Sequence, residues 1–98
     1  MKWEYTDYRP EGFECWEAKW KKDYELSVYQ IGENRYSIGW YHKGCRVIKD
    51  YIDANNWDEA KALAIARIRN YFHQMATYWD NMELGFIKWT REEYYVRK

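Results

Sequence analysis

The side chains that most often carry catalysis or bind metals are few in this sequence, and they are widely spaced. The two cysteines, Cys15 and Cys45, do not form a Cys-x-x-Cys pair. A zinc site would need both of them together with His42 and His73, but this set lacks a recognised ligand spacing. We therefore expect two reduced thiols and no bound metal.

Catalytic motifs are also missing. The sequence contains no glycine-rich phosphate loop, no Gly-x-Ser-x-Gly turn and no His-Glu-x-x-His pair. Both serines, Ser27 and Ser37, stand between large neighbours inside predicted strands. The acidic pairs Asp58-Glu59 and Glu92-Glu93 suit the first turns of helices, where the helix dipole favours negative charge. We predict that the protein is not an enzyme and uses no cofactor.

Binding chemistry is better represented than catalysis. Residues 34–49 contain four basic side chains and no acidic one, although the net charge of the whole chain is zero. The predicted strands of this region place two tyrosines on one face of a sheet, around the small residues Ser27, Ser37 and Gly39. The candidate partner-binding residues on and near this face are Tyr29, Arg35, Tyr41, Lys43 and Arg46.

This sheet face has two interpretations. An antiparallel sheet commonly leaves one face to solvent, and such a face needs no function. Aromatic rings beside basic side chains are also how several proteins stack the bases of single-stranded nucleic acids. The sequence lacks the RNP-type motif of that class, and its zero net charge differs from the basic excess of a general polyanion binder.

Aromatic residues are unusually abundant, with seven Trp, eleven Tyr and three Phe among 98 residues. Each ring buries a large apolar area with few rotatable bonds, so most of the rings are expected to build the core. A chain of this length cannot hide all of them. The surplus is expected at the surface, where Tyr and Trp serve as anchors of protein interfaces.

An antiparallel meander is predicted to position these side chains. Alternation of apolar and polar residues predicts strands over residues 13–20, 24–31, 36–42 and 45–52. A loop at residues 32–34 joins the second strand to the third, and it places Val28 opposite Ile38 and Leu26 opposite Trp40. Every apolar side chain of this hairpin then falls on one face.

Two segments of the sheet region are ambiguous. In the fourth strand, Val47 and Ile48 cannot both point toward the core, so the facing of residues 45–52 stays open, with a bulge as one solution. Residues 1–12 form an aromatic N-terminal arm that ends in a turn signal. The arm either packs through its rings or is left for a partner, and those rings are Trp3, Tyr5 and Tyr8.

A long helix is predicted after the sheet. Asn56 is a good N-cap and Glu59 follows three residues later, as in a capping box. An apolar stripe at helical spacing predicts a helix over residues 57–82 that ends at Gly85. The stripe consists of Ala60, Leu63, Ala64, Ile68, Tyr71, Phe72, Met75, Trp79 and Met82. The polar side of the helix carries Arg69, Asn70, His73, Thr77 and Asp80.

The last part of the chain is predicted as an extended piece over residues 86–89, followed by a short helix. Thr90 and Glu93 form a second capping box for that helix, which continues through Tyr94 and Tyr95.

Together these elements predict a single α+β domain over residues 1–98. A three- to four-stranded antiparallel meander packs against one long helix, and a short C-terminal helix follows. In the expected core, Leu63, Ile68, Phe72 and Met75 face the apolar residues of the hairpin. The apolar arc of the long helix is wide, so pairing between copies of the chain is an alternative way to bury it.

Membrane and export segments are not expected. The longest apolar run is residues 62–66, far short of the about 20 residues that cross a bilayer. Residues 1–7 contain acids where an export signal would be apolar. We therefore expect a cytoplasmic protein.

The small antiparallel sheet followed by the helix start Asn-Trp-Asp-Glu-Ala-Lys-Ala (residues 56–62) resembles many short accessory proteins of phages and mobile elements. The aromatic excess and the lack of catalytic motifs are similar to those of anti-CRISPR proteins, which commonly cover a partner's surface. The resemblance covers roughly residues 13–82 and transfers no site residues. It implies a phage-encoded inhibitor of a bacterial defence complex in the host cytoplasm.

We therefore expect a non-catalytic protein-binding module, of which such an inhibitor is one form. The alternative is a single-stranded nucleic-acid-binding module that uses the exposed sheet face. A homo-oligomer built through the helix is the third interpretation.

Overall fold

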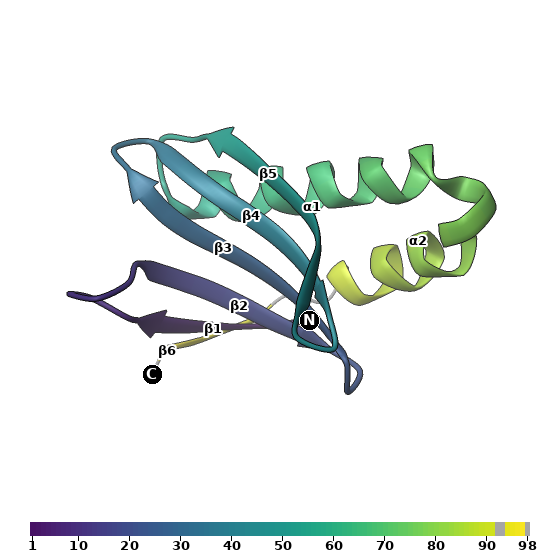
Figure 1. Cartoon of the computed structure of the whole chain (residues 1–98), viewed down its shortest axis with the longest axis horizontal. Coiled ribbons are helices and arrows are strands. Elements are labelled where there is room, and N and C mark those ends of the chain that lie inside the picture. The colour runs from purple at the N-terminus through teal and green to yellow at the C-terminus, as the bar shows by residue number, and fades with distance from the viewer. Residues whose placement is uncertain (92–93, 98) are drawn as a thin grey trace.

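The computed structural model describes residues 1–91 and 94–97, with side chains described for residues 1–75 and 82–91. Figure 1 shows a curved sheet on one side of the molecule and two helices that continue past its edge. The elements in chain order are β1 Lys2–Asp7, β2 Glu14–Trp20, β3 Tyr24–Gly32, β4 Arg35–His42, β5 Cys45–Asp53, α1 Trp57–Gln74, α2 Ala76–Thr90 and β6 Tyr94–Arg97.

The sheet has the strand order β5-β4-β3-β2-β1-β6. Strands β1 to β5 pair as antiparallel neighbours, and β6 adds to β1 in parallel. The α+β class, the antiparallel meander and the presence of one longer and one shorter helix are confirmed. The sheet is larger than the predicted three or four strands, because the N-terminal arm and the last residues both join it.

The register of the β3–β4 hairpin agrees with the prediction. Val28 lies opposite Ile38 and Leu26 opposite Trp40, so one face of the hairpin is apolar. Asn34 in the connecting loop has a φ of 57°, the left-handed conformation that asparagine tolerates in turns.

A bulge decides which side of β5 faces the core. Trp40 pairs with Ile48 while Tyr41 pairs with Arg46, so Val47 has no opposite residue in β4. As a result Ile48 is buried and Val47 is exposed. Beyond the bulge, the outward positions of β5 carry Lys49 and Tyr51.

The aromatic arm packs through its rings. It forms β1, which pairs with β2 and places Tyr5 opposite Trp16. Trp3 and Tyr5 are buried in the core, whereas Tyr8 in the following loop stays exposed. Arg9 closes that loop by donating from Nε and Nη2 to the carboxylate of Asp7.

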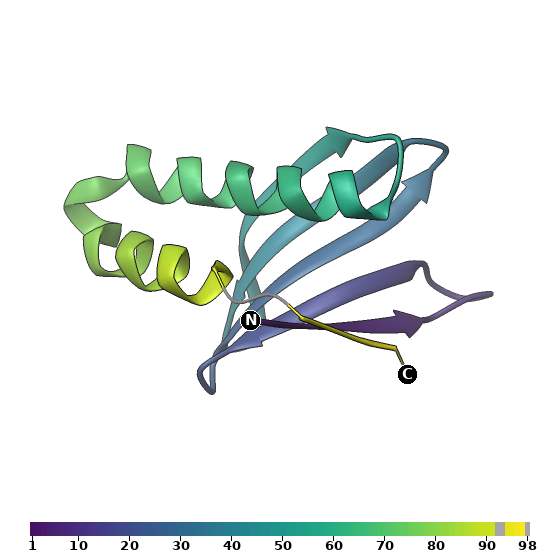
Figure 2. The same cartoon turned by 180° about the vertical axis from the view of Figure 1, so that it is seen from behind.

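Both helices lie on one side of the sheet, as the view from behind shows (Figure 2). The predicted N-cap is confirmed, because the Asn56 side chain accepts a hydrogen bond of 2.8 Å from the Glu59 backbone N–H. The predicted continuous helix to residue 82 is wrong: α1 ends at Gln74, and α2 begins at Ala76 after a turn at Met75. No glycine or proline marks this turn. The chain folds back because the Phe86 ring packs against Phe72, with ring centroids 5.3 Å apart.

The predicted end of the chain is also corrected. Gly85 lies inside α2 and does not end a helix, and residues 86–89 are helical and not extended. Thr90 does not start a helix, since its hydroxyl donates back to the Phe86 carbonyl in the last turn of α2. Glu93, its expected partner, lies outside the described residues. Tyr94–Arg97 is a strand, where a helix was predicted.

The core lies between the sheet and the helices, but α1 presents a different stripe from the predicted one. Ile68 and Phe72 are fully buried as expected. Leu63 and Met75 were expected in the core and are instead 37% and 47% exposed. The helix is rotated so that its buried positions include Lys61, and Trp79 lies outside the side chains described.

Lys61 is buried because aromatic rings surround its ammonium group. Its Nζ lies 3.6 Å from the ring centroid of Trp16 and 6.0 Å from that of Trp3. A cation over an aromatic face is attracted by the ring quadrupole, and the aliphatic stem packs against apolar surface. The lysine thereby attaches α1 to β1 and β2.

Replacing Phe72 by alanine should lower the free energy of unfolding by about 3–5 kcal/mol, because the ring is fully buried between Trp40 and Phe86. The matched truncation Leu63→Ala should cost less than about 1 kcal/mol, since this side chain is partly exposed. Urea denaturation of both variants tests the rotation of α1. Equal urea midpoints for the two variants would contradict it.

Candidate functional site

The side of the sheet away from the helices is uncovered (Figures 1 and 2). The register of β2 to β5 sets its residues in rows: Cys15, Tyr29, Ser37 and Tyr51 form one row, and Lys19, Glu25, Tyr41 and Arg46 form another. We call this surface the outer face. It comprises Tyr8, Phe13, Cys15, Glu17, Lys19, Glu25, Ser27, Tyr29, Ile31, Arg35, Ser37, Gly39, Tyr41, Arg46, Lys49 and Tyr51.

Three of the exposed side chains on the outer face are aromatic rings. Phe13, Tyr8 and Tyr51 are 51%, 48% and 42% exposed, whereas Tyr29 and Tyr41 are half-buried. Two adjacent hollows of about 250 and 410 Å³ have Phe13 and Tyr29 in common. The smaller one is lined by Phe13, Tyr29, Ile31, Ser37, Tyr41 and Arg46.

Arg46 is held flat against the sheet. Its Nη2 donates hydrogen bonds of 2.7 Å to the Ser37 hydroxyl and to the Ile38 carbonyl. The guanidinium lies over Gly39, where an added Cβ would come within 2.6 Å of Nε. It also lies 5.8 Å from the ring centroid of Tyr41. The small residues in this part of the face therefore provide the space that fixes the arginine.

The polar groups beneath the rings are kept neutral. Burial raises the pKa of the Tyr29 hydroxyl, and the nearby Cys15 adds to the effect. Burial is also the main reason why the pKa of the Cys15 thiol is raised, followed by the charge of Glu17. A thiol of raised pKa that has no exposed surface is a poor nucleophile, so Cys15 serves the packing of this face.

Two carboxyl groups share the part of the outer face over β2 and β3. Glu17 accepts a hydrogen bond of 2.7 Å from the Tyr8 hydroxyl, which raises the pKa of Tyr8 to about 12. Burial, and then a hydrogen bond with Glu17, raise the pKa of Glu25 to about 7. The Ser27 hydroxyl lies within 3.4 Å of the Glu25 carboxyl. The raised pKa therefore brings the titration of the Glu25 carboxyl close to neutral pH.

The structure brings together three of the five predicted partner-binding residues. Tyr29, Tyr41 and Arg46 line one hollow. Arg35 lies at the end of the sheet, where it pairs with Asp53 at 3.1 Å. Lys43 occupies the β4–β5 turn, and its side chain lines a separate hollow beside Glu25 and Tyr41.

Sequence reasoning missed several residues of this face. The alternation that puts Cys15 and Glu17 on the polar side of β2 also puts Phe13 there if it is extended by two positions. Tyr51 could not be placed without the bulge at Val47, which reverses the facing of β5. The proximity of Glu17 to Glu25 depends on the β2–β3 register.

The two histidines pack or pair with residues other than the cysteines. The His42 ring stacks on Tyr24, with centroids 4.5 Å apart, and His73 Nδ1 lies 3.2 Å from Glu83. Among the described residues, no group of three His, Cys, Asp or Glu side chains could hold a metal ion. Cys15 and Cys45 are both free.

The raised pKa of Glu25 predicts a pH-dependent stability. The folded protein holds this proton more tightly than the unfolded chain, in which the pKa has its ordinary value of 4.5. The free energy of unfolding should therefore fall as pH rises from about 4.5 to about 7. Glu25→Gln should remove this part of the slope, which urea titrations at a series of pH values can measure.

Glu17→Gln provides the companion variant, because it removes the neighbouring carboxyl group that contributes to the shift. It should move the fall in stability to lower pH. If Glu25→Gln keeps the parent protein's dependence of stability on pH, Glu25 is not the group that causes the fall in stability.

Comparison of the chain with protein-family models, with curated proteins and with solved structures finds no match. In the described part of the chain, no helix is long and apolar enough to cross a membrane.

Proposed function

We propose that the chain is a non-catalytic protein-binding module and that the outer face is its interface. The observation that carries this proposal is the exposure of Tyr8, Phe13 and Tyr51 on a sheet face that no helix covers. Exposed aromatic rings gathered around partly buried ones are the arrangement found at the centres of protein interfaces.

The face is also prepared for binding. Tyr29 and Tyr41 are held by burial, and Arg46 is fixed by two hydrogen bonds. Side chains that are already ordered lose little conformational entropy when a partner docks. Tyrosine and arginine are frequent among the residues that contribute most to binding free energy. The small hollow can accept one side chain of the partner.

Charge favours a protein over a nucleic acid as the partner. Basic side chains occupy the β4 and β5 part of the face, where Arg46 and Lys49 lie. Carboxyl groups occupy the β2 and β3 part, where Glu17 and Glu25 lie. A nucleic-acid strand that crosses the whole face would place phosphates beside these carboxylates, which is unfavourable. A protein with acidic groups toward β5 and basic groups toward β2 complements both parts.

A nucleic-acid partner is the second candidate because the β5 side pairs rings with cations. The Tyr51 ring has Arg35 at 5.6 Å and Lys49 at 5.5 Å from its centroid. Such a group can stack a base and bind a phosphate. This candidate requires affinity for a single-stranded oligonucleotide that falls steeply with salt.

The defence-complex inhibitor and the homo-oligomer remain predictions. Light scattering at high protein concentration tests the homo-oligomer.

The proposal predicts that capture of a partner depends on the outer face. A tagged chain is incubated with a nuclease-treated bacterial lysate, in parallel with Phe13→Ala, Tyr51→Ala and Leu84→Ala variants. Leu84 is the matched control, since it is an exposed hydrophobic residue on α2. A partner should be recovered with the parent and with Leu84→Ala, and its affinity should fall at least about 30-fold in the outer-face variants.

Urea denaturation must first show that all three variants keep the parent's free energy of unfolding to within about 0.5 kcal/mol, the usual effect of a surface substitution. The proposal fails if every protein that the parent captures is captured equally by Phe13→Ala and Tyr51→Ala. A parallel incubation with untreated lysate tests the second candidate, which is favoured if binding occurs there and is lost in the nuclease-treated lysate.

A further inference from the structure

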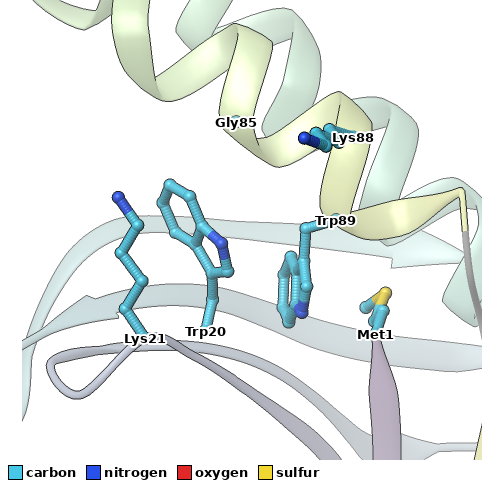
Figure 3. A pocket seen from close by; sticks show the side chains of 6 residues that line it. All are labelled: Met1, Trp20, Lys21, Gly85, Lys88 and Trp89. Atoms are coloured by element: carbon cyan, nitrogen blue, oxygen red, sulfur yellow. The ribbon is translucent and has the colours of Figure 1, made fainter.

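Another hollow lies apart from the outer face, on the helix side of the sheet. It is formed where the end of β2 meets α2, and it has a volume of about 410 Å³ (Figure 3). That volume falls in the range of sites for small molecules, about 300–1,000 Å³. Its lining residues are Met1, Trp20, Lys21, Gly85, Lys88 and Trp89.

Two indole rings form the wall of this groove. Trp20 and Trp89 are partly exposed and lie side by side, with ring centroids 6.1 Å apart and planes inclined by 32°. Both are supported from the core by Trp40, at 6.0 and 6.1 Å. Gly85 lets the Trp20 ring touch α2 directly, since an added Cβ would approach that ring to 2.8 Å. The wall is therefore rigid before any ligand binds.

The charged side chains of the groove are both cations. Lys21 Nζ lies 4.6 Å from the ring centroid of Trp20, and Lys88 extends from α2 above Trp89 (Figure 3). Within residues 1–91, where the structure describes the groove, its lining contains no carboxyl group. Among the described residues, no carboxylate forms an ion pair with Lys21 or Lys88.

We propose that this groove binds a small anion that carries a planar aromatic ring, of the class of a nucleoside monophosphate. The base stacks on the exposed parts of Trp20 and Trp89, and the phosphate accepts hydrogen bonds from Lys21 and Lys88. Stacking on indoles tolerates any base, and lysine binds phosphate as a point charge. Charge favours this ligand over a neutral aromatic molecule, because a phosphate adds charge-assisted hydrogen bonds with the two exposed ammonium groups.

The site is tested by titrating ¹⁵N-labelled protein with AMP at low ionic strength and following the indole N–H resonances. Trp20→Phe and Trp89→Phe variants assign the two relevant signals. These signals should shift with saturation, while the indole of Trp57, which packs on Tyr36 elsewhere in the core, should not. Adenosine should bind at least about tenfold more weakly than AMP, because it lacks the charged group.

Matched charge variants separate the site from a general effect of net charge. Lys21→Gln and Lys88→Gln should each raise the Kd for AMP about five- to tenfold. Lys22 is the control, because it lies in the same turn as Lys21 but does not line the groove. Lys22→Gln should therefore change the Kd for AMP by less than about twofold from that of the parent. A short oligonucleotide with a 5′ phosphate forms a second arm, and the tighter of the two probes identifies a free nucleotide or a strand end as the source.

Equal affinity for AMP and adenosine would overturn the proposal, as would equal effects of Lys21→Gln and Lys22→Gln. Shifts that spread over all indole signals without saturation would also overturn it. Each variant is first compared with the parent by its dispersed NMR spectrum, so a loss of folding cannot be mistaken for a loss of binding.

Discussion

The packing of rings around Trp40 is the constraint on which the rest of the fold depends. Trp40 is fully buried, and its ring lies 5.4–6.1 Å from the rings of five aromatic residues in β2, β3 and both helices. Tilted and edge-on pairs of this kind add to the burial of apolar area. The Trp40 indole N–H finds no hydrogen-bond partner among the described residues, an unfavourable contribution that the surrounding contacts offset. These contacts require α2 to turn back beside α1.

This cluster explains why local patterns predict the sheet better than the helices. Alternation in sequence fixes the β3–β4 register, because a shift by one residue would turn Leu26 and Val28 away from the core. The cap at Asn56 is equally local. The turn at Met75 has no local signal, since it follows from contacts between Phe86 and rings far away in sequence. Tertiary packing overrides helix propensity in such cases.

The outer face was also predictable only where it depends on local patterns. Tyr29, Tyr41 and Arg46 meet because they occupy neighbouring positions of a hairpin and of the strand that follows it. The carboxyl pair and the burial of Lys61 depend on which strands adjoin, and on how α1 is rotated over Trp3 and Trp16. A single sequence does not specify that rotation, because its apolar stripe is wide enough to allow more than one.

The groove and the outer face differ in how closely their aromatic residues contact the core. This difference decides how much a substitution in each surface affects stability. The groove indoles, Trp20 and Trp89, contact Trp40 directly, so a substitution there alters stability together with binding. Phe13 and Tyr51 lie on the opposite side of the sheet and are exposed, and neither belongs to the core cluster. Replacing these two exposed rings should therefore have little effect on the fold, as the proposed interface requires. The groove is restricted to side chains that the aromatic core accepts.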